Sequence, residues 1–215
     1  MVSLSGVGVI DKSMQVLAAL RAGPLDLAAL QAATGLPRAT AHRLATALEV
    51  YHLVRRDDAG RFCLGLELVA LGRSAAEQLG LAAVAMPALA ALRDDTGESV
   101  QLFVREDGMR RCVVSLQSPH GLRWIVPEGS LLPLDAGSAG RVLSVSTPGE
   151  AWAQSVEERE RGVASVSAPV LDRTGAVVAA VSVSGPIERM SRQPGRRFGR
   201  IVAEAGRAIT AALAR

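Results

Sequence analysis

The first part of the chain has apolar side chains at three- and four-residue spacing, which is typical of amphipathic helices. Four apolar residues share one face of a helix predicted over residues 9–21: Ile10, Met14, Leu17 and Ala18. A Gly-Pro pair follows soon afterwards and ends the pattern. The chain is therefore expected to begin its folded part with an amphipathic helix that packs one face on its neighbours.

A second helix is predicted to begin after Asp26, whose carboxylate can accept hydrogen bonds from the free backbone N–H groups of the first turn. Leu27, Leu30 and Ala33 form its buried stripe. Gly35 follows at a position where a residue in the left-handed conformation ends a helix at low cost. The turn into the next element is therefore expected to be tight.

A third helix is predicted with Pro37 in its first turn, where the missing N–H of proline loses no hydrogen bond. Its inner face carries the residues that should pack on the first two helices: Ala41, Leu44, Ala45 and Leu48. Its outer face carries hydrogen-bonding side chains: Arg38, Thr40, His42, Arg43 and Thr46. Arg can bind guanine through two hydrogen bonds, and Thr or His can bond phosphates or base edges. This helix is predicted to be the recognition helix of a DNA-binding domain.

A β-hairpin is predicted directly after the third helix. Two arms flank a four-residue loop that ends in glycine: Val54–Arg56, Asp57–Gly60 and Arg61–Leu64. Three arginines of the arms can neutralise DNA phosphates: Arg55, Arg56 and Arg61. A solvated hairpin would carry the same arginines, so the order of elements matters more than the charge. Three helices with a tight second turn and then a hairpin predict a winged helix-turn-helix over residues 1–65, with double-stranded operator DNA as its partner.

Beyond residue 65 the pattern predicts two helices and then a second domain. Spaced leucines and valines indicate a helix over residues 66–80. A further helix, over roughly 82–95, is expected to end before Gly97. Residues 81–215 would then form the second domain.

The second domain is predicted to be an antiparallel α+β structure. Alternating side chains indicate five strands: Ser99–Arg105, Met109–Leu116, Leu122–Val126, Val163–Leu171 and Ala176–Ser184. A short helix is expected between the two groups of strands, at Gly137–Val145, and a longer one at 195–214. Strands, an inserted helix and strands again are typical of a sheet with its helices on the faces.

Hydroxyl side chains alternate along the last predicted hairpin. Ser165 and Ser167 share one face of the first strand, and Ser182 and Ser184 share one face of the second, because side chains in a strand alternate with period two. Asp135–Gly140 opens the short helix, whose free N–H groups suit an anionic group such as a carboxylate. Together these features predict a site for a small polar metabolite. The alternative is that the serines only bond one another within a sheet of small residues.

Composition sets broad limits on these predictions. The chain has 215 residues, of which 49% are hydrophobic and 3% aromatic, so it can bury a core of Ala, Val and Leu. A net charge of +3 neither demonstrates nor excludes nucleic-acid binding. The three histidines are far apart and the two cysteines are isolated, so no metal and no cofactor are predicted. No signal-peptide pattern and no apolar run of roughly 18 residues is present, which favours a cytoplasmic protein without a membrane partner.

The sequence offers little in support of catalysis. Residues 136–140 approach the Gly-x-Ser-x-Gly nucleophile elbow but lack its leading glycine and follow no clear buried strand. The chain is therefore predicted not to be an enzyme. The main alternative is a ligand-sensing or enzymatic α/β module whose N-terminal helices mediate protein contacts.

Several segments of the chain resemble the IclR family of bacterial transcription regulators. These segments are Gly35–Leu44, Arg56–Gly65, Pro127–Ser130, Asp135–Gly140 and Val181–Pro186. The resemblance spans nearly the whole chain and is closest to the actinobacterial regulators of amino-acid metabolism of the NdgR type. It implies that residues 66–80 form a linker helix used partly for dimer contacts. It implies further that residues 81–215 form a GAF-like effector-binding and oligomerisation domain, and that the protein is a homodimer or tetramer. It also implies control of operator binding by a small metabolite of the amino-acid or 2-keto acid type.

The resemblance also implies where the effector would bind. The family's effector contacts fall on Ser138, Ala139, Ser165, Ser182 and Ser184. The sequence departs from the family at Ser155, where an Asp is common, and at Ser165, where some members have Cys. We include Ser155 in the predicted site, since the loss of a carboxylate there should change which metabolite is accepted.

A second departure concerns length. Between Val145 and Trp152 the resembling proteins have a few dozen additional residues that form a helix and loop over the pocket, whereas this chain has only Ser-Thr-Pro-Gly-Glu-Ala. Either the lid is truly short, or a mobile segment is missing from the printed sequence. We favour the second explanation, because mobile lids over pockets are common.

The mass of the purified protein distinguishes these two explanations. A missing segment predicts a mass above the 22.4 kDa of the printed chain, by the weight of a few dozen residues. Intact-protein mass spectrometry measures this directly. A mass of 22.4 kDa would refute the missing segment and leave a truly shortened lid.

Overall fold

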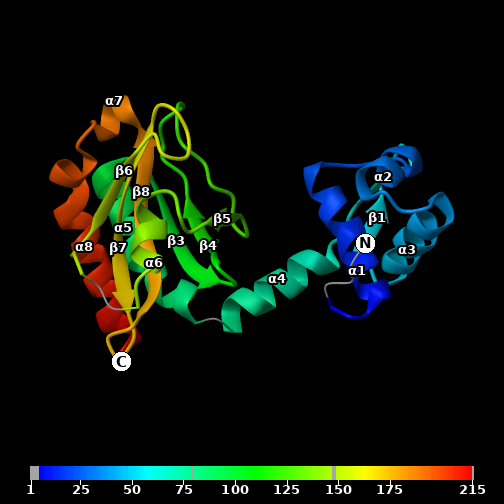
Figure 1. Ribbon diagram of the computed structural model, residues 1–215, viewed down its shortest axis with the longest axis horizontal. Helices are drawn as coiled ribbons and strands as arrows, with labels where there is room; N and C mark the ends of the chain where they lie inside the picture. The colour runs from blue at the N-terminus through cyan, green and yellow to red at the C-terminus, as the bar shows by residue number, and fades with distance from the viewer. Residues whose placement is uncertain (1–4, 79, 147–148, 215) are drawn as a thin grey trace. The chain divides into compact units, whose positions relative to one another are not determined.

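The computed structural model describes residues 5–78, 80–146 and 149–214. The chain forms two compact units, one within residues 1–78 and one within residues 79–215. Figure 1 labels their helices and strands. Each unit has its own hydrophobic core, and each is described here by itself.

The first unit is a helical domain with a two-stranded hairpin. Its elements in chain order are α1 (Gly8–Ala19), the 3₁₀ helix η1 (Leu20–Ala22), α2 (Leu27–Thr34), α3 (Arg38–Val50), β1 (Val54–Arg56), β2 (Phe62–Leu64) and α4 (Glu67–Gln78). The predicted three helices and hairpin are confirmed. The predicted packing face of the first helix is wrong, because Val16 and Leu20 are buried, whereas Ile10 and Met14 are 52% and 58% exposed. Ala33 of the stripe predicted for the second helix is exposed as well. Leu79, at the end of the predicted linker helix, lies outside the described residues.

Local signals set the turn between α2 and α3. The Oδ1 atom of Asp26 accepts a hydrogen bond from the backbone N–H of Ala29 at 2.8 Å, which caps the start of α2. Gly35 ends α2 in the left-handed conformation with a φ of 67°, as predicted. Pro37 lies one residue before α3, at its N-cap. This tight turn brings the apolar sides of α2 and α3 into one core around Leu30, Leu44 and Phe62.

The second unit is a six-stranded antiparallel sheet with helices on both faces. The strands are β3 (Ser99–Glu106), β4 (Met109–Leu116), β5 (Leu131–Pro133), β6 (Ala153–Val156), β7 (Val163–Leu171) and β8 (Val177–Pro186), in the spatial order β5-β4-β3-β8-β7-β6. The helices are α5 (Leu81–Thr96), α6 (Ser138–Leu143), α7 (Ile187–Met190) and α8 (Pro194–Leu213). The predicted antiparallel α+β architecture is confirmed.

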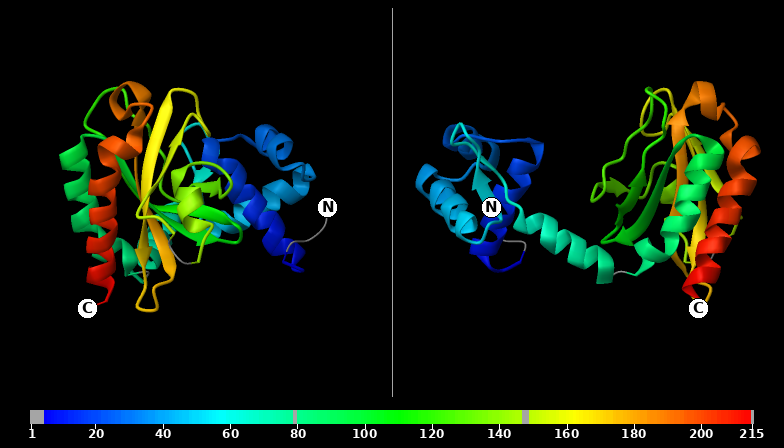
Figure 2. Two further views of the ribbon diagram at one scale, coloured as in Figure 1. Left: turned by 60° about the vertical axis from the view of Figure 1, so that its left-hand side comes forward. Right: turned by 180° about the vertical axis from the view of Figure 1, so that it is seen from behind.

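The two faces of the sheet are covered differently. Figure 2 shows α5 and α8 side by side against one face, where the valines of β7 and β8 pack with Leu89, Leu92 and Val202. The opposite face carries α6, which contacts β6, β7 and β8. Leucine, valine and alanine therefore fill the main core, and the serines of β7 and β8 lie on the side of α6.

One predicted strand is wrong. Residues Leu122–Val126 form no strand, and β5 lies at the sheet edge instead, paired with Met109–Arg111 of β4. The next part of the β4 edge is occupied as well, because Cys112 exchanges backbone hydrogen bonds with Gly129 and Ser130. The backbone groups that a 122–126 strand would need are therefore already bonded to a later segment.

The second unit also contains two short elements and a short bridge that the predicted pattern did not place. The sequence pattern missed β6 and α7, each of only four residues, because so few residues show no clear period. In the bridge between Val145 and Trp152, residues 147 and 148 lie outside the described residues.

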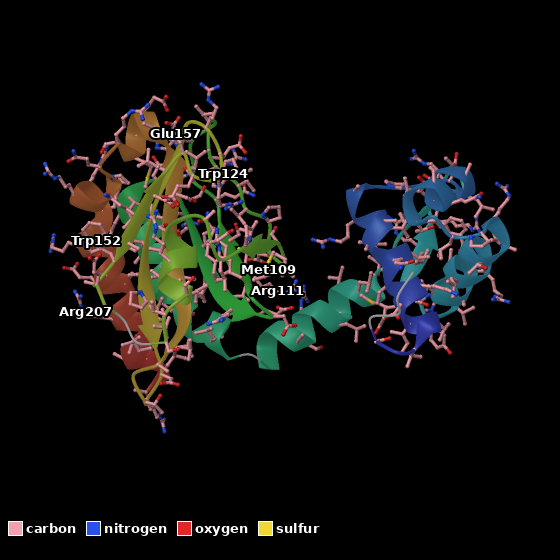
Figure 3. All side chains as sticks on the ribbon, viewed as in Figure 1. Met109, Arg111, Trp124, Trp152, Glu157 and Arg207 are labelled. Atoms are coloured by element: carbon pink, nitrogen blue, oxygen red, sulfur yellow. The ribbon has the colours of Figure 1, made fainter. Side chains whose placement is uncertain are left out.

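The packing of α8 against Trp152 gives a stability prediction. Trp152, labelled in Figure 3, lies against Gly195 and Gly199 of α8, and a Cβ on Gly199 would come within 2.5 Å of the indole ring. We expect Gly199→Ala to destabilise the second unit by about 1–3 kcal/mol, since the ring or the helix must shift. Tryptophan fluorescence during denaturant unfolding measures this, because both tryptophans lie in this unit.

The matched control is Gly121→Ala. Gly121 has open space around the position of a Cβ and lies in the same unit. The free energy of unfolding of this variant should therefore differ from that of the wild type by less than about 0.5 kcal/mol. Equal effects of the two substitutions would contradict the packing described for Trp152.

Candidate nucleic-acid interface and ligand cavity

The outer face of α3 presents the predicted DNA-binding side chains. Ala41, Leu44, Ala45 and Leu48 are buried, which fixes the rotation of the helix and leaves the other face outward. Arg38, His42, Arg43 and Thr46 are exposed and Thr40 is half-buried. Within the described part of the chain, Arg38 and Arg43 have no ion pair, so both guanidinium groups are available to an external anion.

The three arginines of the hairpin differ in their surroundings. Arg56 lies 4.1 Å from the centre of the Phe62 ring and donates a hydrogen bond to the carbonyl of Gly60 at 3.1 Å. It also forms an ion pair of 3.5 Å with Glu49 of α3. The preceding residue of the strand, Arg55, points to the opposite face because side chains alternate, and it has no ion pair among the described residues. Arg55 is therefore the hairpin cation that is least engaged within the protein.

Arg61 is bound within its own loop. Its guanidinium contacts the carboxylate of Asp57 at 2.7 and 2.8 Å, and its backbone N–H donates to the same carboxylate at 2.9 Å. The hydrogen bond from the Arg61 side chain lowers the pKa of Asp57. The loop is thus held closed by one residue pair, and the charge of Arg61 is largely balanced.

The first unit therefore combines a helix with two unpaired arginines and a hairpin with a third. A helix of this kind fits the major groove, and cations on an adjacent hairpin fit the phosphates beside it. The eight residues that the sequence singled out all lie on α3 or on the hairpin of this unit.

The second unit contains a cavity that gathers the predicted ligand-binding residues. The cavity is small, about 40 Å³, and opens to solvent. All six predicted residues line it: Ser138, Ala139, Ser155, Ser165, Ser182 and Ser184. They come from α6, β6, β7 and β8, so sequence positions up to 46 residues apart meet at one place.

Five serine hydroxyls in and beside this cavity form a continuous chain of hydrogen bonds. The Oγ–Oγ distances are 2.9 Å from Ser155 to Ser165, 2.7 Å from Ser165 to Ser138, 2.7 Å from Ser138 to Ser167, and 2.9 Å from Ser167 to Ser182. The strand register explains two of the contacts, since Ser167 lies opposite Ser182 in the β7–β8 pairing and Ser155 lies opposite Ser165 in the β6–β7 pairing. The serines do bond one another, as the alternative interpretation expects, but four of the five also line the cavity.

The start of α6 is held by charged side chains. The backbone N–H of Gly137 donates to Oε2 of Glu158 at 2.9 Å, and the other oxygen of Glu158 pairs with Arg141. Arg110 donates through Nη1 to the carbonyls of Pro133 at 2.5 Å and Ala136 at 2.7 Å. The free end of this short helix is thus partly occupied by Glu158, which the sequence pattern did not predict.

Sequence reasoning missed several lining residues. These are chiefly Gln101, Phe103, Arg110, Trp124 and Arg159, of which Trp124 is labelled in Figure 3 on the loop after β4. The sequence did contain an indication for Arg110. It lies two and four residues before Cys112 and Val114, so the three side chains share one face of β4, and the other two are buried. Burial and the nearby positive charge of Arg159 together lower the pKa of Arg110 to about 10, although the carboxylate of Asp135 acts in the opposite direction. The sequence did not predict this buried cation at the cavity.

Within residues 5–78, 80–146 and 149–214, no helix combines the length and the apolar character that a membrane span needs. No group of three or more His, Cys, Asp or Glu side chains in these ranges lies together in a way that could hold a metal ion.

Comparison with known proteins gives a consistent result. Residues 9–58 match the IclR helix-turn-helix domain, and residues 73–151 and 145–211 match the C-terminal domain of bacterial transcriptional regulators of the IclR type. The second match consists of two stretches that overlap at residues 145–151, in the bridge before Trp152. The matched families are regulators of transcription and not enzymes.

Individual relatives agree with this match. The glycerol operon regulatory protein of Streptomyces coelicolor is 28% identical over 86% of this chain and 87% of its own. The transcriptional repressor IclR of Escherichia coli K12 is 25% identical over 88% of this chain and 83% of its own.

Solved structures show the same fold. The Thermotoga maritima IclR structure has a TM-score of 0.77 at 17% identity, covering 97% of this chain and 99% of that one. An IclR homolog from Microbacterium hydrocarbonoxydans, complexed with 4-hydroxybenzoate, has a TM-score of 0.82 at 20% identity, covering 95% and 98%.

Proposed function

The chain belongs to the IclR family of bacterial transcriptional regulators, and we propose that a small metabolite bound in the serine-lined cavity controls its binding to operator DNA. The observation that carries this proposal is the cavity itself, where four elements of the second unit bring polar side chains together. A ligand can act only through a different affinity for DNA-competent and DNA-incompetent states.

We assign operator contacts to the outer face of α3 and to the hairpin. Base reading is proposed for Arg38, His42 and Arg43, with Thr40 and Thr46 beside them. Phosphate contacts are proposed for Arg55, Arg56 and Arg61. Of these, Arg55 is expected to contribute most, because Arg56 and Arg61 already have partners within the protein.

For the effector we propose a small acid of amino-acid metabolism, an amino acid or a 2-keto acid. The closer resemblance to the NdgR-type regulators supports this class. The related protein from Microbacterium hydrocarbonoxydans is complexed with 4-hydroxybenzoate, a small carboxylic acid, so a small acid suits this fold. The presence of Ser155 in place of an Asp is expected to change which acid is accepted.

We also propose that the protein acts as a dimer or tetramer in the cytoplasm. One recognition helix reads few bases, and two half-sites related by symmetry raise specificity. The region where α4 begins carries exposed apolar side chains that suit a contact between copies: Leu66, Val69 and Leu71. These are the residues of the proposed linker helix over 66–80.

The DNA-binding assignment is tested by replacing Arg38 and Arg43 with alanine. Both residues are exposed, so folding should be unchanged, whereas each lost contact should weaken binding by about 1–3 kcal/mol. The measurement is fluorescence anisotropy on duplexes that the wild-type protein selects from a random pool, repeated over a salt series.

The matched control removes two exposed arginines of α8, Arg196 and Arg207, and so gives the same change of net charge. This control should bind the selected duplexes like the wild type. Unchanged affinity of the Arg38/Arg43 variant across the salt series would count against the assignment.

The effector assignment is tested by Ser182→Val. A thermal-shift screen with amino acids and 2-keto acids should give a stabilising ligand for the wild type, and the variant should lose that shift because it loses a cavity hydroxyl. Ser115→Val is the control, since Ser115 lies on β4 outside the cavity and should keep the shift. A full ligand response in Ser182→Val would contradict the proposed site.

A further inference from the structure

We propose that Arg56 acts in operator binding mainly as a positioning residue, which holds the hairpin in place against α3 through Glu49 and Phe62. The inference rests on the proposed operator contacts of the first unit and narrows them, because it separates the role of Arg56 from that of Arg55. Three contacts of one guanidinium group and one unexpected carboxylate lead to it.

The register of the hairpin places Arg56 on the face that packs on the helices. Arg56 lies opposite Phe62 across the two strands, and Val54 lies two residues before it on the same face. Phe62 and Val54 are each 1% exposed and belong to the core of the first unit. The side chain of Arg56 therefore leaves the hairpin on the side of the core, whereas that of Arg55 leaves it on the other side.

The guanidinium group of Arg56 joins three parts of the first unit. Its Cζ atom lies 4.1 Å from the centre of the Phe62 ring, Nη1 donates to the carbonyl of Gly60 at 3.1 Å, and Nε lies 3.5 Å from the carboxylate of Glu49. These partners belong to β2, to the loop of the hairpin and to α3. Phe62 is itself fixed, because its backbone N–H and C=O exchange hydrogen bonds with Leu25 at 2.8 and 2.9 Å. Arg56 therefore connects α3 to a strand that is already held.

Glu49 is the unexpected member of this arrangement. It is the only acidic residue of α3 and lies one residue before the end of the helix. A negative charge at a helix C-terminus is unfavourable, and a carboxylate close to DNA repels the phosphates. Within the described residues its carboxylate forms one ion pair, with Arg56. This pairing accounts for an acid on a helix whose outer face otherwise presents arginines.

A positioning role and a phosphate contact respond differently to salt. A phosphate contact releases counterions from the DNA, so its removal lowers the slope of log Kd against log salt concentration by about one per copy of the chain. The removal of a positioning residue weakens binding with little change of this slope.

The two roles also differ in the sign of the effect expected at Glu49. If only charge matters, the removal of a negative charge near DNA strengthens binding. If Glu49 holds the hairpin through Arg56, its removal weakens binding.

Fluorescence anisotropy of the full chain on its selected duplexes, over a salt series, tests the inference. Arg56→Met removes the charge and should weaken binding about 3- to 10-fold, since the ion pair and the ring contact are lost, while the salt slope changes by less than about one half per copy. Arg55→Met is the same chemical change on the other face, and its salt slope should fall by about one per copy. Equal falls of the slope in both variants would overturn the positioning role.

Glu49→Ala keeps the inference testable if Arg56→Met folds poorly, because alanine suits a helix and Glu49 is only half-buried. This variant should weaken binding about 2- to 5-fold. Combined with Arg56→Met it should add less than about a further twofold, since both changes remove one shared interaction. The control Asp58→Ala removes the same charge from the exposed hairpin loop, where Asp58 has no ion pair among the described residues, and binding should stay unchanged or become tighter.

The outcomes separate this inference from the operator contacts on which it rests. Unchanged or tighter binding of Glu49→Ala, with binding still weakened by Arg55→Met and by the Arg38/Arg43 changes, would overturn the positioning role alone. Wild-type binding by all of these variants would overturn the operator contacts together with it.

Discussion

The alternation of side chains along β7 and β8 is the constraint on which the second unit depends. Their pairing places Ser165 opposite Ser184 and Ser167 opposite Ser182, while Val166 and Val183 face the other side. The valines enter the core with α5 and α8. The serines lie on the side of α6, where Ser165, Ser182 and Ser184 line the cavity. A slip of one residue would exchange the two faces, burying hydroxyls against leucine and exposing valine to the cavity. The same register therefore holds the core together and builds the binding site.

The start of α6 completes the cavity because two of its glycines allow the backbone to lie very close to neighbouring groups. Gly140 lies so near the carbonyl of Leu134 and the guanidinium of Arg110 that a Cβ could not be accommodated. Gly137 leaves room for Arg110 and Arg159 and has a φ of 87°, which glycine adopts without strain. Small residues at these two positions let a buried cation pass beneath the helix and reach the cavity wall.

Much of this structure could be predicted because its signals are local. The cap at Asp26, the left-handed Gly35 and the period-two serines each act within a few residues, and all are confirmed. The predicted strand at Leu122–Val126 was wrong because the edge of β4 pairs with a more distant segment, β5, and the local pattern does not show which segment pairs there. Gln101 and Arg110 were missed for a related reason. Each has a buried nitrogen without a hydrogen-bond partner among the described residues, Nε2 of Gln101 and Nε of Arg110. Such an unpaired donor can be recognised only once the positions of all neighbouring strands are known. The operator contacts on α3 and the hairpin stay a prediction from sequence order and exposure.

In the proposed regulator, ligand binding in the cavity and operator binding at the first unit are coupled. The most direct test is the Kd of the protein for a selected duplex, measured without and with a saturating concentration of a ligand that binds the cavity. Coupling predicts a change of about 5- to 150-fold in this Kd, and the duplex must change the affinity for the ligand by the same factor. Independent binding of duplex and ligand, with both Kd values unchanged by the other partner, would contradict it.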